Sequence, residues 1–268
     1  MNFKPLNSDK YALVAGGSKG IGLGIATALA KRNYNLVIIA RNEINLTSAK
    51  KLLESKFGID VIIIVQDLSD TDAAENIIQS ISTQNLKICM LCNVAGLGGS
   101  HDFLSLSNEE LKEMILLNIS SPVSLSELFI PMLEKNSPSY ILNVASMAGF
   151  APIPKKNLYA STKSALLFFS YSLYFQLKEK KIHVSCLCPG PVYTKPEIKK
   201  ETVRNLGKLG DAMAMTPEDV GEIAVRQCLN GKMLIIPGKL AKIMSVFVRL
   251  LPPMLLTWIY YRIESTTK

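Results

Sequence analysis

Short apolar runs alternate along the chain with longer stretches in which apolar residues recur every three or four positions. Seven runs are almost continuously apolar, which is typical of strands in a parallel sheet covered on both faces. These runs span residues 11–17, 35–41, 60–68, 88–96, 139–146, 183–190 and 232–238. Because segments with helical spacing separate them, the pattern predicts an α/β fold. We expect a Rossmann-like, doubly wound, mostly parallel sheet of seven strands with helices on both faces.

Composition and charge narrow the class of protein. The chain has 268 residues, 48% of them hydrophobic, which suits one large domain or one domain with an appendage. The formal net charge is +8, and the basic residues are scattered rather than clustered. We therefore expect no nucleic-acid partner, whereas an anionic cofactor or an anionic membrane surface fits this charge.

The five cysteines lie inside apolar runs, which indicates buried, reduced thiols. The spacing of Cys89 and Cys92 is that of a C-x-x-C pair, but no second pair follows at zinc-site spacing, so we predict no metal site. The N-terminus, MNFKPLNSDK, is polar and is not expected to be a signal peptide. These features favour a cytoplasmic protein.

A glycine-rich stretch, VAGGSKGIGLG at 14–24, links the first predicted strand to the first predicted helix. Glycines let a backbone approach an anion closely, and a helix start presents free N–H groups to it. The spacing is Gly16-x-x-x-Gly20-x-Gly22, which matches neither of the two common phosphate-loop patterns. The stretch by itself is either a phosphate-binding loop or a tight structural turn.

Further motifs occur downstream in a fixed order, each next to a predicted strand or helix. They are NVAG at 93–96, Ser146 in NVASMAG, YASTK at 159–163 and PGPVYT at 189–194. Together with the glycine stretch, this set resembles the short-chain dehydrogenase/reductase family over about residues 10–238. Three positions depart from the family pattern, namely Ala15, Val94 and Ala145. They affect loop bracing and neighbouring contacts rather than the reacting groups.

Tyr159 and Lys163 are four residues apart in a stretch of helical length, so they share one helix face. An ammonium group close to a phenol lowers the pKa of tyrosine from its usual value near 10. A tyrosine tuned in this way can exchange a proton with a substrate oxygen.

The resemblance implies specific roles for these residues and for two others. Tyr159 is the expected general acid/base, and Lys163 lowers its pKa and holds the nicotinamide ribose. Ser146 donates a hydrogen bond to the substrate oxygen. Asn118 supports a water that relays protons; its alternative interpretation is a polar residue that bends a helix.

The resemblance also implies a dinucleotide site along the loops that follow the strands. The remaining expected cofactor-binding residues are Gly16, Ser18, Lys19, Gly20, Ile21, Gly22, Arg41, Asp67, Leu68, Asn93, Ala95, Gly96, Pro189, Gly190, Val192 and Thr194. Asp67 is placed near the adenine, although it could instead cap a helix or serve in both ways.

The end of the second predicted strand indicates which nicotinamide cofactor is used. Ala40 stands where an NAD-type acidic residue would bind the ribose hydroxyls, and Arg41 follows it. Lys19 adds a second cation inside the glycine stretch. Two cations without the acid favour NADP(H) over NAD(H), because both groups bind phosphate well.

The C-terminal segment differs from the rest of the chain. Residues 243–261 are almost wholly apolar, but Arg249 and the pair Pro252–Pro253 interrupt them, and each half is too short to cross a bilayer. Three alternatives remain: a helical hairpin buried against its own domain or a partner subunit, a segment lying on a membrane surface through 239–263, or a wall of the substrate site. Basic residues flank the segment, as the membrane alternative requires, namely Lys239, Lys242, Arg249 and Arg262.

These observations predict a Rossmann-fold dinucleotide-binding and catalytic domain at 1–238 and an apolar helical appendage at 239–268. We expect an NADPH-dependent oxidoreductase that interconverts a carbonyl and an alcohol on an apolar or lipid-like small molecule, with residues 195–215 as a lid. Two alternatives are a nucleotide-binding protein without useful turnover and a membrane-associated interaction protein that uses the tail. The resemblance also implies a homodimer or homotetramer assembled through helices at 122–135 and 157–180.

Overall fold

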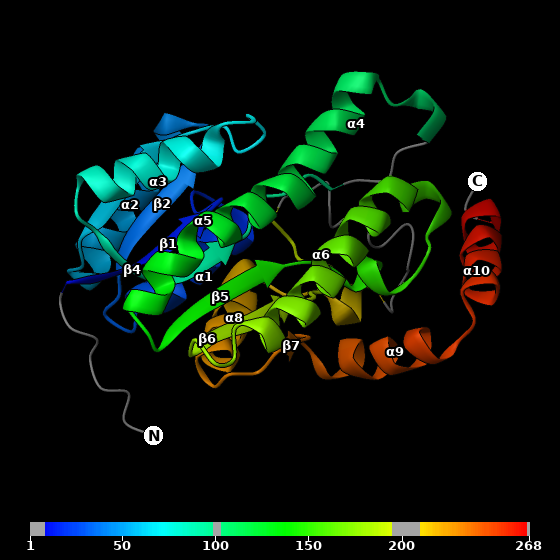
Figure 1. Cartoon of the computed structure of the whole chain (residues 1–268). Coiled ribbons are helices and arrows are strands. Elements are labelled where there is room, and N and C mark those ends of the chain that lie inside the picture. The colour runs from blue at the N-terminus through cyan, green and yellow to red at the C-terminus, as the bar shows by residue number, and fades with distance from the viewer. Residues whose placement is uncertain (1–8, 99–102, 195–209, 267–268) are drawn as a thin grey trace.

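The computed structural model describes residues 9–98, 103–194 and 210–266 (Figure 1). Seven strands form one sheet in the order β3-β2-β1-β4-β5-β6-β7, and every pairing between neighbours is parallel. The strands are β1 Lys10–Ala15, β2 Asn35–Ala40, β3 Val61–Val65, β4 Lys87–Asn93, β5 Ser139–Val144, β6 Ile182–Leu187 and β7 Leu234–Ile235. The doubly wound sheet expected from the apolar runs is confirmed.

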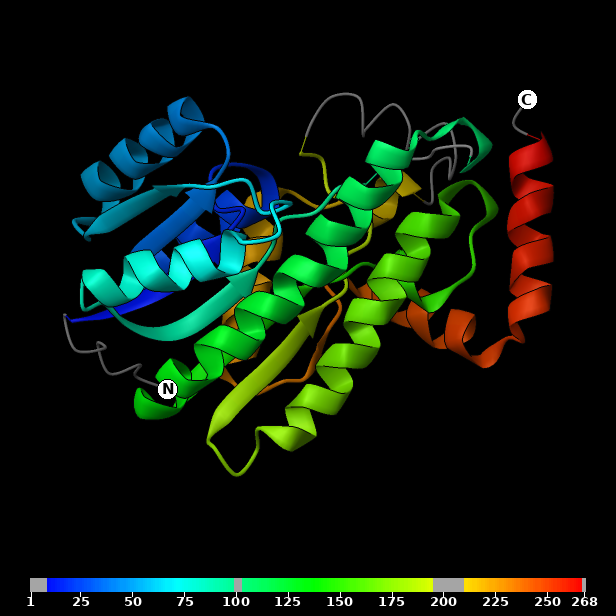
Figure 2. The ribbon, with the colours of Figure 1, turned by 45° about the horizontal axis from the view of Figure 1, so that its top comes forward.

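Helices cover both faces of this sheet (Figures 1 and 2). The α-helices are α1 Gly20–Ala30, α2 Glu43–Phe57, α3 Ala73–Thr83, α4 Asn108–Ile115, α5 Ser121–Lys135, α6 Asn157–Gln176, α8 Pro217–Leu229, α9 Lys239–Leu250 and α10 Pro253–Thr266. Alternate residues of each strand face opposite sides. On β1, Val14 packs with residues of α1, α2 and α8, whereas Leu13 packs with residues of α3, α5 and α6.

Helices α1 and α8 pack closely because each has a glycine where the two backbones meet. A Cβ on Gly24 of α1 would lie 2.1 Å from the Pro217 carbonyl oxygen, and one on Gly221 of α8 would lie 2.2 Å from the Gly24 carbonyl carbon. Neither position therefore accepts a side chain without moving a helix. This packing fixes α1, which begins at the glycine-rich stretch.

A continuous helical run from Asn108 to Lys135 joins α4, a π-helical turn η2 at Leu116–Ser120, and α5. Ser107 begins the run with a reciprocal capping box to Glu110. Among the residues described, this run alone is long and apolar enough to cross a membrane, by length and composition only. Here α5 packs against β4.

The C-terminal appendage is a pair of helices, α9 and α10, separated by Leu251 and Pro252. The residue before a proline favours an extended backbone, and Leu251 has a ψ of 142°. The break predicted from the two prolines is confirmed. The large apolar side chains of both helices are mostly exposed, so the expectation of a hairpin buried against its own domain is wrong.

Candidate active site

The motif residues meet at the carboxyl edge of the sheet. Strand register aligns Ala15 with Asn93, and Asn93 with Asn143, while Val144 is aligned with Leu187. The loops that leave β1, β4, β5 and β6 therefore begin side by side. Strand order also reverses here, because β1 leads to β2 on one side and adjoins β4 on the other. In open α/β sheets, ligands bind at this kind of crevice.

The glycine stretch wraps tightly between two of these loops. Gly16 has a φ of 94°, and a Cβ there would lie 2.7 Å from the Ala95 nitrogen. Gly20 has a φ of 55°, and its Cβ would lie 3.1 Å from Thr194 Cγ2. A Cβ on Gly22 would lie 1.9 Å from the Gly16 carbonyl oxygen. All three positions thus require glycine, and the backbone between Gly16 and Gly22 carries little side-chain bulk.

Helix α1 starts inside this loop with its N-terminus uncapped by a side chain. Lys19 is the N-cap residue, and its exposed side chain makes no capping hydrogen bond, because an ammonium group has no acceptor for the helix N–H groups. The first N–H groups of a helix lack intrahelical partners and attract anions. Ser18 and Gly22 are buried beside them, and Ile21 is half-buried. The loop has the geometry of a phosphate cradle.

Ser146, Tyr159 and Lys163 lie together beyond β5. Ser146 lies two residues after Val144, the last residue of β5. Its Oγ accepts a 3.1 Å hydrogen bond from the Ala148 nitrogen. The Ser146 hydroxyl is near enough to the Tyr159 phenol to act on its pKa. Lys163, one turn along α6, is buried; its Nζ donates to the Val144 carbonyl oxygen at 2.9 Å and lies 5.9 Å from the Tyr159 ring centroid.

The ionisation of this group differs from the expectation. Burial raises the pKa of Tyr159 above its usual value of 10, and the nearby Ser146 hydroxyl opposes that rise. Burial also lowers the pKa of Lys163 to about 8. The predicted lowering of the Tyr159 pKa by Lys163 is not observed, because the ammonium donates to Val144 instead of to the phenol. At neutral pH Tyr159 is protonated and can donate a proton.

Asn118 lies in the π-helical turn η2, fully buried. Its Oδ1 accepts from the Leu97 nitrogen at 2.9 Å, and its Nδ2 donates to the Leu97 oxygen at 2.9 Å and to Thr162 Oγ1 at 3.0 Å. A Cβ on Gly96 would lie 2.9 Å from Asn118 Oδ1 and 3.1 Å from Lys163 Nζ. Asn118 therefore fastens the loop after β4 to helix α6.

Two features of this region were missed by the sequence analysis. The apolar spacing of residues 108–135 predicts a helix but carries no signal for a π-turn, which often marks a functional site. Thr162 lies within the YASTK motif, and its hydroxyl joins Asn118 to the Tyr159 carbonyl oxygen, 2.8 Å away. A polar residue on the buried face of a helix is the signal that could have identified it.

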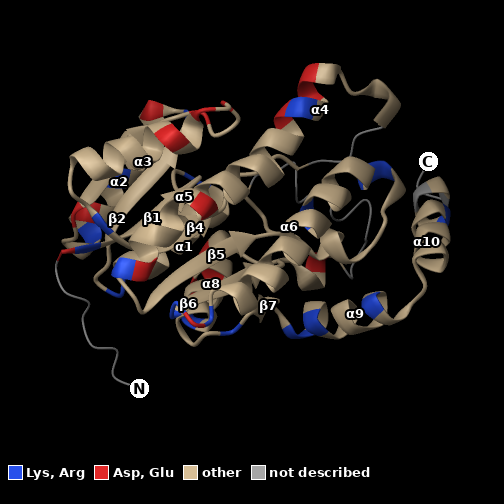
Figure 3. Cartoon of the chain, in the orientation of Figure 1, with Lys and Arg blue, Asp and Glu red and all other residues tan. Residues whose placement is uncertain are grey.

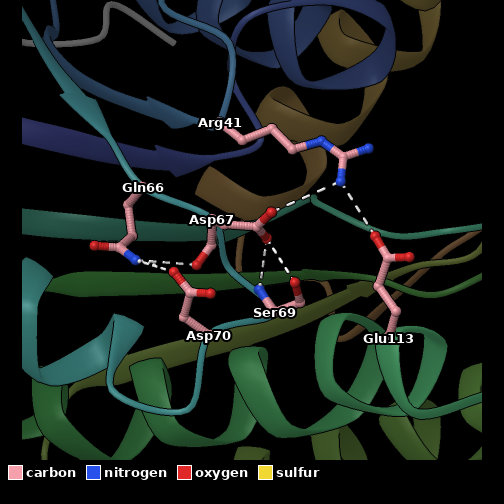
Figure 4. Close-up of polar contacts among 6 residues, drawn as sticks. All are labelled: Arg41, Gln66, Asp67, Ser69, Asp70 and Glu113. Atoms are coloured by element: carbon pink, nitrogen blue, oxygen red, sulfur yellow. Dashed lines mark hydrogen bonds and ion pairs between the residues drawn. The ribbon is translucent and has the colours of Figure 1, made fainter. Parts of the chain in front are cut away.

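A charged cluster lies where β2 and β3 end (Figure 4). Arg41 follows β2, its side chain 63% exposed; its Nη1 lies 3.1 Å from Glu113 Oε1 and 3.7 Å from Asp67 Oδ2. Asp67 accepts from the Ser69 nitrogen at 2.9 Å and from Ser69 Oγ at 2.7 Å. These bonds, with the Arg41 charge, hold the pKa of Asp67 below its usual value.

The charged cluster decides whether Asp67 caps a helix, and it includes Glu113, a residue that the sequence analysis did not identify. Helix α3 begins after Asp72, so Asp67 is not its cap but braces the turn before it. Leu68, next to it, is buried in the core. Glu113, on α4, belongs to no motif and lies on an exposed helix face, so nothing in the sequence marked it as a partner of Arg41.

The other predicted cofactor residues lie along the same edge. Pro189 accepts from the Met147 nitrogen at 3.0 Å, and Val192 bridges to Met215 near Gly190 and Thr194. The Asn93 side chain instead enters a buried network, donating to Asn143 Oδ1 at 2.8 Å, so contact between Asn93 and a cofactor stays a prediction. Most of the predicted lid, residues 195–209, lies outside the described residues.

All five cysteines are buried and form no disulfide, which confirms the expectation of free, buried thiols. The sulfur atoms of Cys186 and Cys188 lie 3.9 Å apart. Burial raises the pKa of Cys89 to about 11 and that of Cys228 to about 12. These two thiols are therefore protonated at neutral pH.

Comparison with known proteins identifies the class that this fold and site define. The profile of the short chain dehydrogenase family matches residues 10–205, so the chain belongs to that family. The parallel α/β sheet and the order of the motifs along the chain agree with that membership.

Individual relatives differ in the length they share with the chain. It is 34% identical to the very-long-chain 3-oxoacyl-CoA reductase-B of Danio rerio over 72% of its own length and 63% of that protein. It is 29% identical to the NADP-dependent 3-hydroxy acid dehydrogenase of Schizosaccharomyces pombe, over 80% of its own length and 85% of that protein. The chain thus spans less than two thirds of the Danio relative.

A solved structure similar to this one is the L-sorbose reductase of Gluconobacter frateurii complexed with NADPH and L-sorbose. The TM-score is 0.76 at 25% sequence identity, and the alignment covers 85% of this chain and 94% of the reductase.

Proposed function

We propose that the chain is an NADPH-dependent reductase that converts a ketone or aldehyde to an alcohol on an apolar substrate. The observation that carries this proposal is that Ser146, Tyr159 and the buried Lys163 gather at the sheet edge that also holds the glycine cradle. Bound NADPH would supply the hydride.

The chain's own residues supply position and a proton. Ser146 donates a hydrogen bond to the substrate oxygen as negative charge develops there. Tyr159, protonated at neutral pH, gives its proton to that oxygen, and the resulting phenolate is stabilised by Ser146 and the nearby ammonium of Lys163. Asn118 holds Gly96 and α6 at the distance this geometry needs. Its support of a relay water stays a prediction, because its amide already bonds Leu97 and Thr162.

The residues at the end of β2 fit NADP(H) better than NAD(H). The exposed guanidinium of Arg41 can form paired hydrogen bonds with a 2′-phosphate, and Ala40 offers no carboxylate to a free ribose hydroxyl. Lys19, exposed at the start of α1, adds a second cation. NADPH in the similar sorbose reductase and the NADP dependence named for the yeast relative support the same choice.

The substrate class rests on the relatives and on the apolar surroundings of the site. The Danio relative is named for a 3-oxoacyl thioester, a carbonyl carried on a long apolar chain. Residues packed behind Ser146 include the apolar Met147 and Phe150. We therefore favour a ketone attached to an acyl or other lipid-like group, with reduction as the main direction.

The test is NADPH oxidation, followed by absorbance, with a panel of 3-oxoacyl thioesters, bulky ketones and sugar-derived carbonyls. Turnover that disappears in Tyr159→Phe supports the proposal. NADPH binding with no oxidation on any member of the panel would instead favour a nucleotide-binding protein without useful turnover, the first alternative.

Assembly and location remain proposals. We favour a homodimer or homotetramer through α5 and α6, and the large exposed side chains of Phe168 and Phe175 on α6 support a covered face there. A cytoplasmic location, with peripheral contact at a membrane through residues 239–263, agrees with the charge and the amphipathic tail. Size-exclusion chromatography with light scattering tests the assembly.

A further inference from the structure

The two C-terminal helices present an unusual surface, which we name the outer apolar face. On α9, four large apolar residues recur at helical spacing, and on α10 four more continue the face. Its members are Ile243, Val246, Phe247, Leu250, Met254, Leu255, Trp258 and Tyr261. Leu250, Met254 and Trp258 are 76%, 81% and 58% exposed. Large apolar side chains exposed in this number on two consecutive helices mark a surface that contacts something apolar.

The residues that α9 buries against the body of the protein are small, whereas many of its large apolar residues are exposed. Ala241 and Ser245, one turn apart, are each only 1% exposed and face the body of the protein. An ordinary surface helix buries its large apolar residues and exposes its small polar ones. Helix α9 does the reverse, so packing within this chain does not account for its large apolar residues.

Charge decides between two occupants of the face. Every charged residue from 239 to 263 is basic, namely Lys239, Lys242, Arg249 and Arg262 (Figure 3). A second copy docked by the same face would bring two sets of like charges together. An anionic lipid surface would accept the apolar side chains and pair with the basic ones. The charge therefore favours lipid.

The appendage is attached next to the catalytic residues. Helix α9 packs on the turn η3 at Met147–Phe150, and α10 packs on the turn η4 at Pro154–Lys156. These turns make up most of the segment between Ser146 and Tyr159. The Arg249 guanidinium also lies 5.4 Å from the Phe150 ring centroid. Both ribbon views place α9 and α10 at the end of the molecule far from β3.

We propose that the outer apolar face docks on an anionic lipid surface and that the catalytic site takes its carbonyl substrate from that surface. Helices α9 and α10, which carry the docking face, pack on the turns between Ser146 and Tyr159, so an acyl chain held in lipid at this face is brought close to that segment. The substrate part rests on the proposed function; the docking part stands without it.

The chain carries its own probe, because Trp258 is its single tryptophan and lies on this face. Tryptophan emission is recorded with vesicles of phosphatidylcholine alone and of phosphatidylcholine with phosphatidylglycerol. We expect a shift to shorter wavelength and quenching by brominated acyl chains, at least tenfold stronger at equal lipid for the anionic vesicles. Added salt weakens the basic contribution and should reduce binding.

Two double variants give the control. Leu250→Glu with Met254→Glu places acids on the outer face and should lower vesicle binding at least tenfold. Ile44→Glu with Leu52→Glu makes the same change on exposed positions of α2 and should leave binding unchanged. Lys239→Gln with Lys242→Gln should reduce binding to the anionic vesicles alone.

The proposal is overturned if Trp258 emission does not change with either vesicle, or if the α2 variant loses binding as much as the outer-face variant. A dimer that the outer-face variant dissociates, with no lipid response, would assign the face to a second copy. NADPH oxidation with a water-soluble ketone separates the two proposals. It should persist in the outer-face variant, so failure of docking alone leaves the reductase proposal intact.

Discussion

Arg41 offers a sharp test of cofactor choice, because its guanidinium is exposed and has only surface partners. Replacing it with alanine removes the one cation at the end of β2 without disturbing buried groups. NADPH carries a 2′-phosphate and NADH does not, so the two cofactors report separately on this side chain. We expect Arg41→Ala to weaken NADPH binding far more than NADH binding.

The size of the effect follows from two opposing contributions. A hydrogen bond to a charged group contributes about 1.5–3 kcal/mol. Before NADPH binds, Arg41 must leave Glu113 and Asp67, and surface ion pairs of this type are worth about 0–1 kcal/mol. With a mid-range cost of about 0.5 kcal/mol for the ion pairs, the net contribution is about 1–2.5 kcal/mol, or roughly a 5- to 70-fold change in the dissociation constant. The NADH constant should move less than about twofold.

The assay is a titration of each reduced cofactor by its own fluorescence, at fixed ionic strength, in the wild type and in Arg41→Ala. Lys51→Ala, which removes another exposed cation from α2, is the matched control and should leave both constants unchanged. Equal losses for NADPH and NADH in Arg41→Ala would refute the assignment of Arg41 to the 2′-phosphate.

Three further predictions concern single positions. Glu113→Gln frees Arg41 from a competing carboxylate, so calorimetry should show NADPH binding up to about fivefold tighter and NADH binding unchanged; a weaker NADPH complex would mean that Glu113 holds Arg41 in position. The pKa of Lys163 is lowered to about 8, so the ammonium is present below that pH and lost above it. The reduction rate at saturating NADPH should therefore be level from pH 6 to 7 and fall above about 8, and a rate that rises there would contradict the role given to Lys163. Gly22→Ala forces a methyl to within 1.9 Å of the Gly16 oxygen. Urea unfolding should show a loss of about 1–3 kcal/mol and titration a weaker cofactor complex, whereas unchanged values for both would show that the loop is loose.

The sheet could be predicted from the sequence because the central strands are buried on both faces and are therefore almost continuously apolar. The grouping of the candidate catalytic residues could be predicted because Tyr159 and Lys163 have a fixed helical spacing and Ser146 follows a strand. These patterns involve residues that are close together in the sequence, so they can be recognised without knowledge of the fold. The glycine stretch needed the downstream motifs, since its own spacing was compatible with a structural turn.

Contacts between distant segments could not be predicted in the same way. Glu113 meets Arg41 only because the fold brings α4 within side-chain reach of the residue after β2. The π-helical turn that holds Asn118 has no signature in the apolar spacing. The ionisation of Tyr159 depends on where Lys163 Nζ points, and the Val144 carbonyl oxygen, a backbone atom, decides that. The reversed polarity of α9 emerged only when the structure showed which side of the helix meets the body.

The central claim is that Tyr159 delivers the proton in an NADPH-dependent carbonyl reduction. The most direct measurement is steady-state NADPH oxidation on the best substrate of the panel for the wild type, Tyr159→Phe and Tyr174→Phe. Tyr174 lies on the same helix and its variant makes the same chemical change away from the site. We predict a loss of about 10²–10⁴-fold in kcat for Tyr159→Phe, with NADPH affinity retained, and a normal rate for Tyr174→Phe. Full activity in Tyr159→Phe would contradict the account.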